Sequence, residues 1–153
     1  MRIQRHFTHE DKSPYDGLVF RKASSEIRNP DGSVVFQASD LEVPESWSQV
    51  ACDVLAQKYF RKAGIPAVLK AVKEKDVPQW LWASVPDQDA MKSMPAEDQF
   101  GGEHSAKQVF DRLAGTWTYW GWKGGYFDSE ADARAYFDEM RYQLYAQLCA
   151  PNS

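Results

Sequence analysis

The sequence predicts a mainly α-helical domain of three main helices plus short helices, with a small N-terminal β-hairpin. Three observations support this fold class. Apolar residues recur at helical spacing in three separate stretches, which indicates three helices that each bury one face. Residues that begin or end helices bound every stretch. Two apolar runs near the N-terminus flank one strong turn signal, the pattern of a hairpin. We expect the main helices at about 46–63, 105–123 and 130–149.

The N-terminal segment is polar and is punctuated by Pro14 and Gly17, so we expect an extended arm over residues 1–17. A hairpin follows at about 18–38, with an Asn-Pro-Asp-Gly turn at residues 29–32. Proline fixes its own φ near the value that a turn needs, and glycine accepts a positive φ. Because a lone hairpin is barely stable in water, we expect it to pack on the helices or on another domain.

The first main helix starts after Pro44, and Gly64 is the residue expected to end it. Its buried face carries seven residues at helical spacing: Trp47, Val50, Ala51, Val54, Leu55, Tyr59 and Ala63. Beyond it, four prolines divide residues 66–104 into short pieces. Since proline interrupts helices, we expect only short helices in this region.

The other two main helices carry clearer boundary signals. Ser105 can cap the second helix, and Gly124-Gly125 ends it. One side of this helix carries Val109, Phe110, Leu113, Ala114, Trp117, Trp120 and Gly121. Ser129 opens a Ser-x-x-acid capping pattern for the third helix, and Pro151 prevents its continuation. The whole helical domain is expected to span residues 18–150.

The composition excludes several classes of protein. Of 153 residues, 43% are hydrophobic and 26% charged, which is ordinary for a globular domain, and the net charge is −4. No run of Lys or Arg is dense enough to follow a nucleic-acid backbone. No apolar run is long enough to span a bilayer, and the N-terminus lacks the apolar region of a signal peptide. Two distant cysteines, Cys52 and Cys149, fit reduced thiols in a cytoplasmic protein.

Residue spacing points to neither a catalytic nor a metal site. The three histidines (His6, His9 and His104) are scattered, and no nucleophile–His–acid grouping emerges. The glycines at 121–125 follow a helix, whereas a phosphate-binding loop precedes one. Four carboxylates, Glu130, Asp132, Asp138 and Glu139, are expected on the first turns and the solvent-facing side of the last helix.

The densest feature is the aromatic run at residues 116–127, which includes three Trp and two Tyr. Trp117 and Trp120 lie on the apolar stripe of their helix, so we expect both to be mostly buried. Tyr119 and Trp122 lie off the stripe, and we expect them to be more exposed. We interpret Tyr119, Trp122 and Tyr126 as an inter-domain contact. A platform on which a base or another ligand stacks is the alternative.

Several long stretches resemble one known family. Residues 105–117, the run on to Phe127, residues 20–36, Trp47-Ser48-Gln49-Val50-Ala51 and the closing Ala-Pro-Asn-Ser are similar to the N-terminal domain of adenosylcobalamin-dependent (class II) ribonucleotide reductases. The resemblance covers essentially the whole chain. It implies a helical N-terminal domain that precedes a ten-stranded α/β barrel, with residues 151–153 starting the linker into that barrel.

The resemblance also implies a function for the parent enzyme, which would reduce ribonucleotides to deoxyribonucleotides by thiyl-radical chemistry started by adenosylcobalamin. Its catalytic residues and most of its cobalamin site would lie beyond this segment. The segment itself would bind no cofactor, and its one candidate substrate contact is Ser153. Its partners would be the barrel of the same chain and, in the parent, ribonucleotide substrate and nucleotide effectors. The alternative is an autonomous helical interaction or regulatory module that binds a protein or nucleotide through exposed aromatics.

Overall fold

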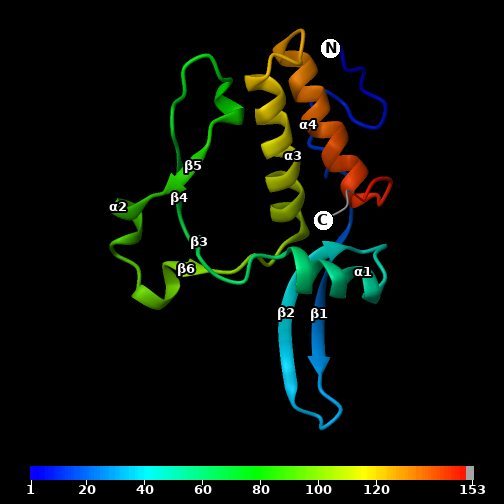
Figure 1. Cartoon of the computed structure of the whole chain (residues 1–153), viewed down its shortest axis with the longest axis vertical. Coiled ribbons are helices and arrows are strands. Elements are labelled where there is room, and N and C mark those ends of the chain that lie inside the picture. The colour runs from blue at the N-terminus through cyan, green and yellow to red at the C-terminus, as the bar shows by residue number, and fades with distance from the viewer. Residues whose placement is uncertain (151–153) are drawn as a thin grey trace. The chain divides into compact units, whose positions relative to one another are not determined.

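The computed structural model describes residues 1–150 (Figure 1). The chain forms two compact units. Unit 1 comprises Met1–Tyr59 and the chain from His104 onward, and unit 2 comprises Phe60–Glu103. The prediction of a mainly α-helical domain is wrong, because 37% of the chain is helical and 21% is in strands. The second strand of the hairpin is longer than predicted. Unit 2 also contains strands, where the sequence had indicated only short helices.

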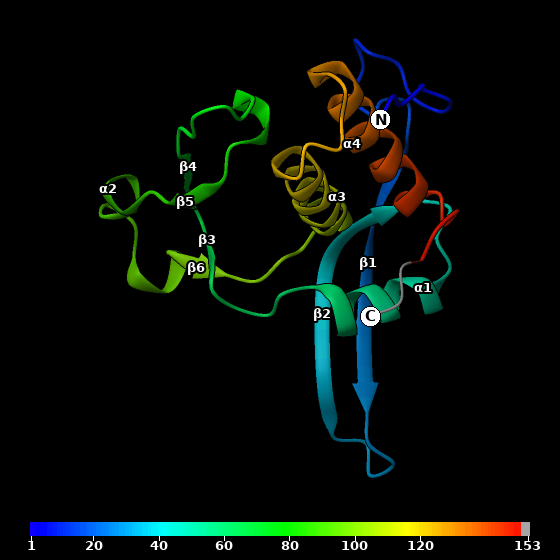
Figure 2. The same cartoon turned by 45° about the horizontal axis from the view of Figure 1, so that its top comes forward.

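Unit 1 contains one long hairpin, a short helical segment and two long helices (Figures 1 and 2). Its elements, in chain order, are β1 (Phe20–Arg28), β2 (Val34–Pro44), α1 (Gln49–Val54), the π-helical turn η1 (Leu55–Tyr59), α3 (Ala106–Lys123) and α4 (Glu130–Tyr145). Helices α3 and α4 pack side by side, and α1 packs on β1.

The predicted helix at 105–123 is confirmed as α3, and its boundaries follow from the predicted signals. Ser105 forms a capping box with Gln108: the Ser105 hydroxyl accepts from the Lys107 N–H, and the Gln108 side chain accepts from the Ser105 N–H. At the other end the N–H of Gly124 binds the carbonyl of Trp120, and Gly125 takes the left-handed conformation with φ 69°. Glycine tolerates this conformation because it lacks Cβ.

Helix α4 begins as predicted but ends earlier. The Ser129 hydroxyl accepts from the Asp132 N–H at the start. At the end, the N–H of Leu148 binds the carbonyl of Gln143 and the N–H of Gln147 binds that of Leu144, the pair of bonds that defines a Schellman motif. Gln147 has φ 57°, a position usually held by glycine. This motif ends the helix before the predicted residue 149.

The hairpin is confirmed, with a second strand that runs six residues past the predicted end at 38. The turn is the predicted one: the N–H of Gly32 binds the carbonyl of Asn29, and Gly32 has φ 86°. The strands pair from Phe20 opposite Pro44 to Arg28 opposite Val34. The half nearest the helices buries one apolar face (Ala23, Leu41 and Val43), which explains why the pairing continues beyond the predicted strand end. The tip points away from α3 and α4 (Figure 1).

The first main helix is shorter than predicted. It starts at Gln49 rather than 46, because the side chain of Ser48 accepts from the Ala51 N–H and caps it. It ends in the π-helical turn at Tyr59, before the predicted stop at 63. Immediately afterwards the backbone pairs with residues far along the chain: the N–H of Arg61 binds the Glu103 carboxylate, and the Arg61 carbonyl accepts from the Glu103 N–H. No local pattern indicates this pairing.

Unit 2 is built from short strands and single helical turns around a few buried apolar side chains, Phe60, Val77, Leu81 and Met91. Two strand pairs hold it together, β3 with β6 and β4 with β5, both antiparallel. Its elements are β3 (Ile65–Pro66), β4 (Leu69–Ala71), η2 (Gln79–Leu81), β5 (Ser84–Pro86), α2 (Gln88–Met91), η3 (Ala96–Asp98) and β6 (Phe100–Gly101). The helical turns begin near prolines as expected; the strands were not predicted.

Candidate functional site

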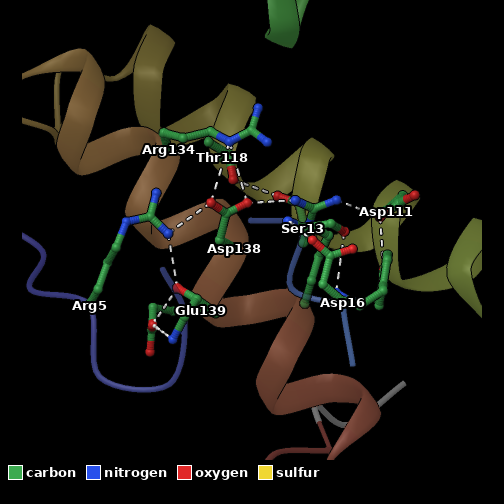
Figure 3. A network of polar contacts seen from close by, with 12 residues as sticks. Arg5, Ser13, Asp16, Asp111, Thr118, Arg134, Asp138 and Glu139 are labelled. Carbon is green, nitrogen blue, oxygen red and sulfur yellow. Dashed lines mark hydrogen bonds and ion pairs between the residues drawn. The ribbon is translucent and has the colours of Figure 1, made fainter. Parts of the chain in front are cut away.

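The N-terminal arm is anchored along α4 by carboxylates of that helix (Figure 3). Glu139 Oε1 accepts hydrogen bonds from the backbone N–H groups of His6, Phe7 and Thr8, at 3.0, 3.1 and 2.9 Å, and from the Thr8 hydroxyl at 2.7 Å. Nearer the start of the helix, Asp132 accepts from the N–H of Ile3 at 2.8 Å. The arm is therefore held mainly through its backbone.

The electrostatics of Glu139 follow from these bonds. Burial alone would raise the pKa of the Glu139 carboxyl. The hydrogen bonds from the Thr8 hydroxyl and from the N–H groups of Phe7, Thr8 and His6 stabilise the carboxylate more strongly, so the net pKa is lowered. Glu139 was expected to face solvent, and this expectation is wrong because the arm covers it.

Asp138 lies beside Glu139 and is completely buried, which also contradicts the expected solvent-facing position. Three guanidinium groups surround its carboxylate: Arg5 at 2.8 Å, Arg141 at 2.5 Å and Arg134 at 3.3 Å (Figure 3). Arg5 also donates to the Thr8 hydroxyl oxygen at 2.9 Å, so the contacts of Asp138 and Glu139 form one network. Buried charges persist when they are paired and hydrogen-bonded in this way.

The network continues to α3 through Arg141, which pairs with Asp111 at 3.1 Å and lies over the ring of Phe137. The hydroxyl of Tyr15 donates to the same Asp111 oxygen at 2.8 Å. Burial and the neighbouring Asp111 carboxylate raise the pKa of the Tyr15 phenol, so it remains protonated and serves as a donor. These contacts join the arm, α3 and α4 into one body and have the character of a structural network.

On another side of unit 1, η1, α3 and the residues after α4 surround an apolar pocket of about 350 Å³. Its walls are mostly large apolar side chains: Trp47, Val54, Leu55, Tyr59, Val109, Phe110, Leu113, Trp117, Leu144, Gln147, Cys149 and Ala150. The indole N–H of Trp47 donates to the carbonyl of Tyr145 at 2.7 Å, which fixes one wall. Only a few polar groups, such as the Gln147 amide and the Cys149 thiol, line this pocket.

An apolar stripe on α3 leads from this pocket along the helix. Val109 is buried, Leu113 and Trp117 are half-buried, and Trp120 is 63% exposed. The expectation that Trp120 is buried is therefore wrong. Because successive helical residues are about 100° apart, Trp120 lies on the same side of the helix as Val109. It sits three turns further on, past the side chains that form the pocket.

The predicted inter-domain residues lie at the C-terminal end of α3 and just after it. Tyr126 is 64% exposed, whereas Tyr119 and Trp122 are only half-buried. The Lys123 ammonium lies 6.0 Å from the centre of the Tyr119 ring. The predicted substrate contact, Ser153, lies outside the described residues. Among the residues that are described, no three His, Cys, Asp or Glu side chains are grouped so that they could hold a metal ion.

Both cysteines were predicted to be reduced and without a role, and both are free thiols in the structure. Cys52 is buried beside Arg21, and burial raises its pKa. None of the helices within residues 1–150 is long and apolar enough to cross a membrane.

Comparison with known proteins identifies the family to which this chain belongs. The family described as class II vitamin B12-dependent ribonucleotide reductase matches residues 21–147, most of the chain. The chain belongs to this family. The match is to its N-terminal domain, as the resemblance of the sequence had indicated. It includes all of the hairpin after Phe20, both long helices and every residue of the apolar pocket up to Gln147.

Individual members of the family align with the chain over its full length. The vitamin B12-dependent ribonucleotide reductase of Bradyrhizobium diazoefficiens is 61% identical over 153 residues, which are 100% of this chain and 12% of that protein. The enzyme of Agrobacterium fabrum is 60% identical with the same coverage, and that of Streptomyces coelicolor is 29% identical over 155 residues. The chain thus spans about an eighth of the length of these relatives.

Proposed function

We propose that this chain is the N-terminal, non-catalytic domain of an adenosylcobalamin-dependent ribonucleotide reductase in the cytoplasm. The parent enzyme reduces ribonucleotides to deoxyribonucleotides by thiyl-radical chemistry. The supporting observation is the alignment of the whole chain, at 61% identity, with 12% of a vitamin B12-dependent ribonucleotide reductase. The domain's role is to dock on the catalytic barrel of the same polypeptide, and its substrate and nucleotide effectors bind elsewhere in the enzyme.

The docking surface comprises the aromatics at and just after the end of α3, with Tyr119, Trp122 and Tyr126 as the predicted contacts. Trp120 joins them, since it is more exposed than either Tyr119 or Trp122. Tryptophan and tyrosine contribute heavily to interfaces because each buries a large area with little loss of conformational freedom.

The apolar pocket of unit 1 is a poor match for the cofactor. Small-molecule pockets of about 300–1,000 Å³ combine apolar walls with several placed polar groups. The pocket of unit 1 lies at the small end of this range and offers few polar groups. A corrin ring is large and carries amide side chains around its rim that need many hydrogen-bond partners. This mismatch supports assigning the cofactor to the rest of the enzyme.

The proposal is tested by comparing the full-length enzyme with residues 1–153 alone. The full-length enzyme should reduce ribonucleotides in the presence of adenosylcobalamin and a dithiol, whereas residues 1–153 alone should not. Isothermal titration of residues 1–153 with adenosylcobalamin should show no saturable heat. Micromolar binding would contradict the assignment of the cofactor to the rest of the enzyme. A reading frame that ends at Ser153 would favour the autonomous interaction module instead.

A further inference from the structure

The apolar pocket of unit 1 has no assigned occupant, and its position suggests one. Three of its wall residues, Gln147, Cys149 and Ala150, belong to the segment that follows α4. Any chain that continues past Ala150 is therefore tethered at the rim of the pocket. A tethered segment has a high effective concentration at a nearby site, which favours its binding over that of a free ligand.

The chemistry of the pocket also favours a side chain over a small molecule. Trp47, Phe110 and Trp117 form apolar walls, and Trp47 already uses its indole N–H on the Tyr145 carbonyl. Small-molecule sites rely on a few placed polar groups to orient the ligand. An apolar side chain needs none and gains about 25 cal/mol for each Å² of apolar surface removed from water.

We propose that this pocket receives a large apolar side chain from the part of the enzyme that follows the domain. The inference rests on the proposed function and identifies a specific docking contact for it. The related enzymes are about eight times as long as this chain, so in them a long polypeptide follows the matched region and can supply this side chain. The stripe of Leu113, Trp117 and Trp120 extends the same contact along α3.

Hydrogen exchange measured by mass spectrometry tests the contact in the full-length enzyme, with residues 1–153 as the reference. We expect amides of η1 and of residues 144–150 to exchange at least tenfold more slowly in the full-length enzyme. Val54→Trp places a large side chain at the mouth of the pocket, where Val54 is 43% exposed. It should remove this protection from the enzyme. The control Val19→Trp, at a 62% exposed position outside the pocket, should leave the protection unchanged.

The outcomes separate this inference from the proposed function. Protection at residues 119–126 without protection around the pocket would overturn the inference and leave domain docking intact. No protection at either place would overturn both. Protection of the pocket in residues 1–153 that disappears on dilution would identify a second copy as the occupant and overturn the inference. Thermal melting of the Val54→Trp domain, expected within a few degrees of the parent, checks that the variant folds.

Discussion

One oxygen of Glu139 binds both the backbone N–H and the hydroxyl of Thr8, at 2.9 and 2.7 Å, across 131 positions of sequence. The N–H groups of His6 and Phe7 point at the same oxygen. A single side chain of α4 thus satisfies most of the donors at the centre of the arm.

Glu139→Ala should release the centre of the arm. Hydrogen bonds to charged groups contribute about 1.5–3 kcal/mol each, and their effects overlap at one oxygen, so we expect a loss of about 2–4 kcal/mol in the free energy of unfolding. Urea denaturation measures this loss. Glu10→Ala removes an exposed carboxylate from the same arm and should change stability by less than about 0.5 kcal/mol.

The effect of Glu139 should depend on pH. Its pKa is lower in the folded protein than in the unfolded chain, so its stabilisation is fully present above the unfolded value, about 4.3. It is lost as pH falls through the folded pKa. The stability difference between the parent and Glu139→Ala should therefore be constant from pH 7 to 5 and shrink below pH 4. A difference that grows on acidification would contradict the structure.

Asp138→Asn should be strongly destabilising, because it removes the carboxylate that the buried guanidinium of Arg141 shares with the half-buried guanidinium of Arg5. Breaking a buried ion pair from one side costs about 3–5 kcal/mol. Asp89→Asn, which removes one partner of the exposed pair with Lys92, should cost less than about 1 kcal/mol. Equal effects of the two substitutions in chemical denaturation would show that the Asp138 network contributes little.

Two glycines of α3 should respond to alanine in opposite directions. A Cβ on Gly121 would lie 2.7 Å from the ring of Phe127, so the ring must move, at a cost of about 1–3 kcal/mol. A Cβ on Gly115 would meet Phe137 at an ordinary 3.7 Å. Gly115→Ala should therefore stabilise the protein by about 0.5–1 kcal/mol, the usual gain in helix propensity. Thermal melting of both variants compares them directly.

Gln147→Gly should stabilise unit 1. Gln147 holds the left-handed position of the Schellman motif, and this conformation costs a residue with a Cβ about 1 kcal/mol or more. Glycine removes that cost. Gln143→Gly, two residues before the last residue of α4, should instead destabilise by about 1 kcal/mol. If both variants lose stability, the Gln147 side chain contributes contacts that outweigh its backbone strain.

The parts of the fold that the sequence predicted are those with local causes. Ser105 and Gln108 cap α3 through neighbouring backbone groups, and Gly32 closes its turn through its own φ, so each signal acts within a few residues. The end of the first helix was missed because it depends on Arg61 pairing with Glu103, 42 positions away. The additional strands were missed for the same reason, because pairs such as β3 with β6 join residues that are far apart in the sequence.

The positions of the carboxylates could not be predicted from periodicity alone. Asp138 and Glu139 lie on the side of α4 that the apolar stripe leaves polar, which normally faces solvent. In this protein a second polar segment, the arm, covers that side and supplies donors in place of water. The arm supplies an Arg, a Thr and several backbone N–H donors, but it has no apolar stripe that would predict packing. Its composition is common in unstructured termini, so it does not indicate a buried segment.

The position of the arm also governs how the protein is made. Thr8 leaves the ribosome 131 residues before Glu139, its partner. At about 5–20 residues per second, the arm waits roughly 7–26 s for the helix that holds it. Unit 2 and the hairpin are complete in sequence well before then, so they can fold first. The nascent chain therefore exposes this arm to proteases and chaperones until nearly the whole domain has been synthesised.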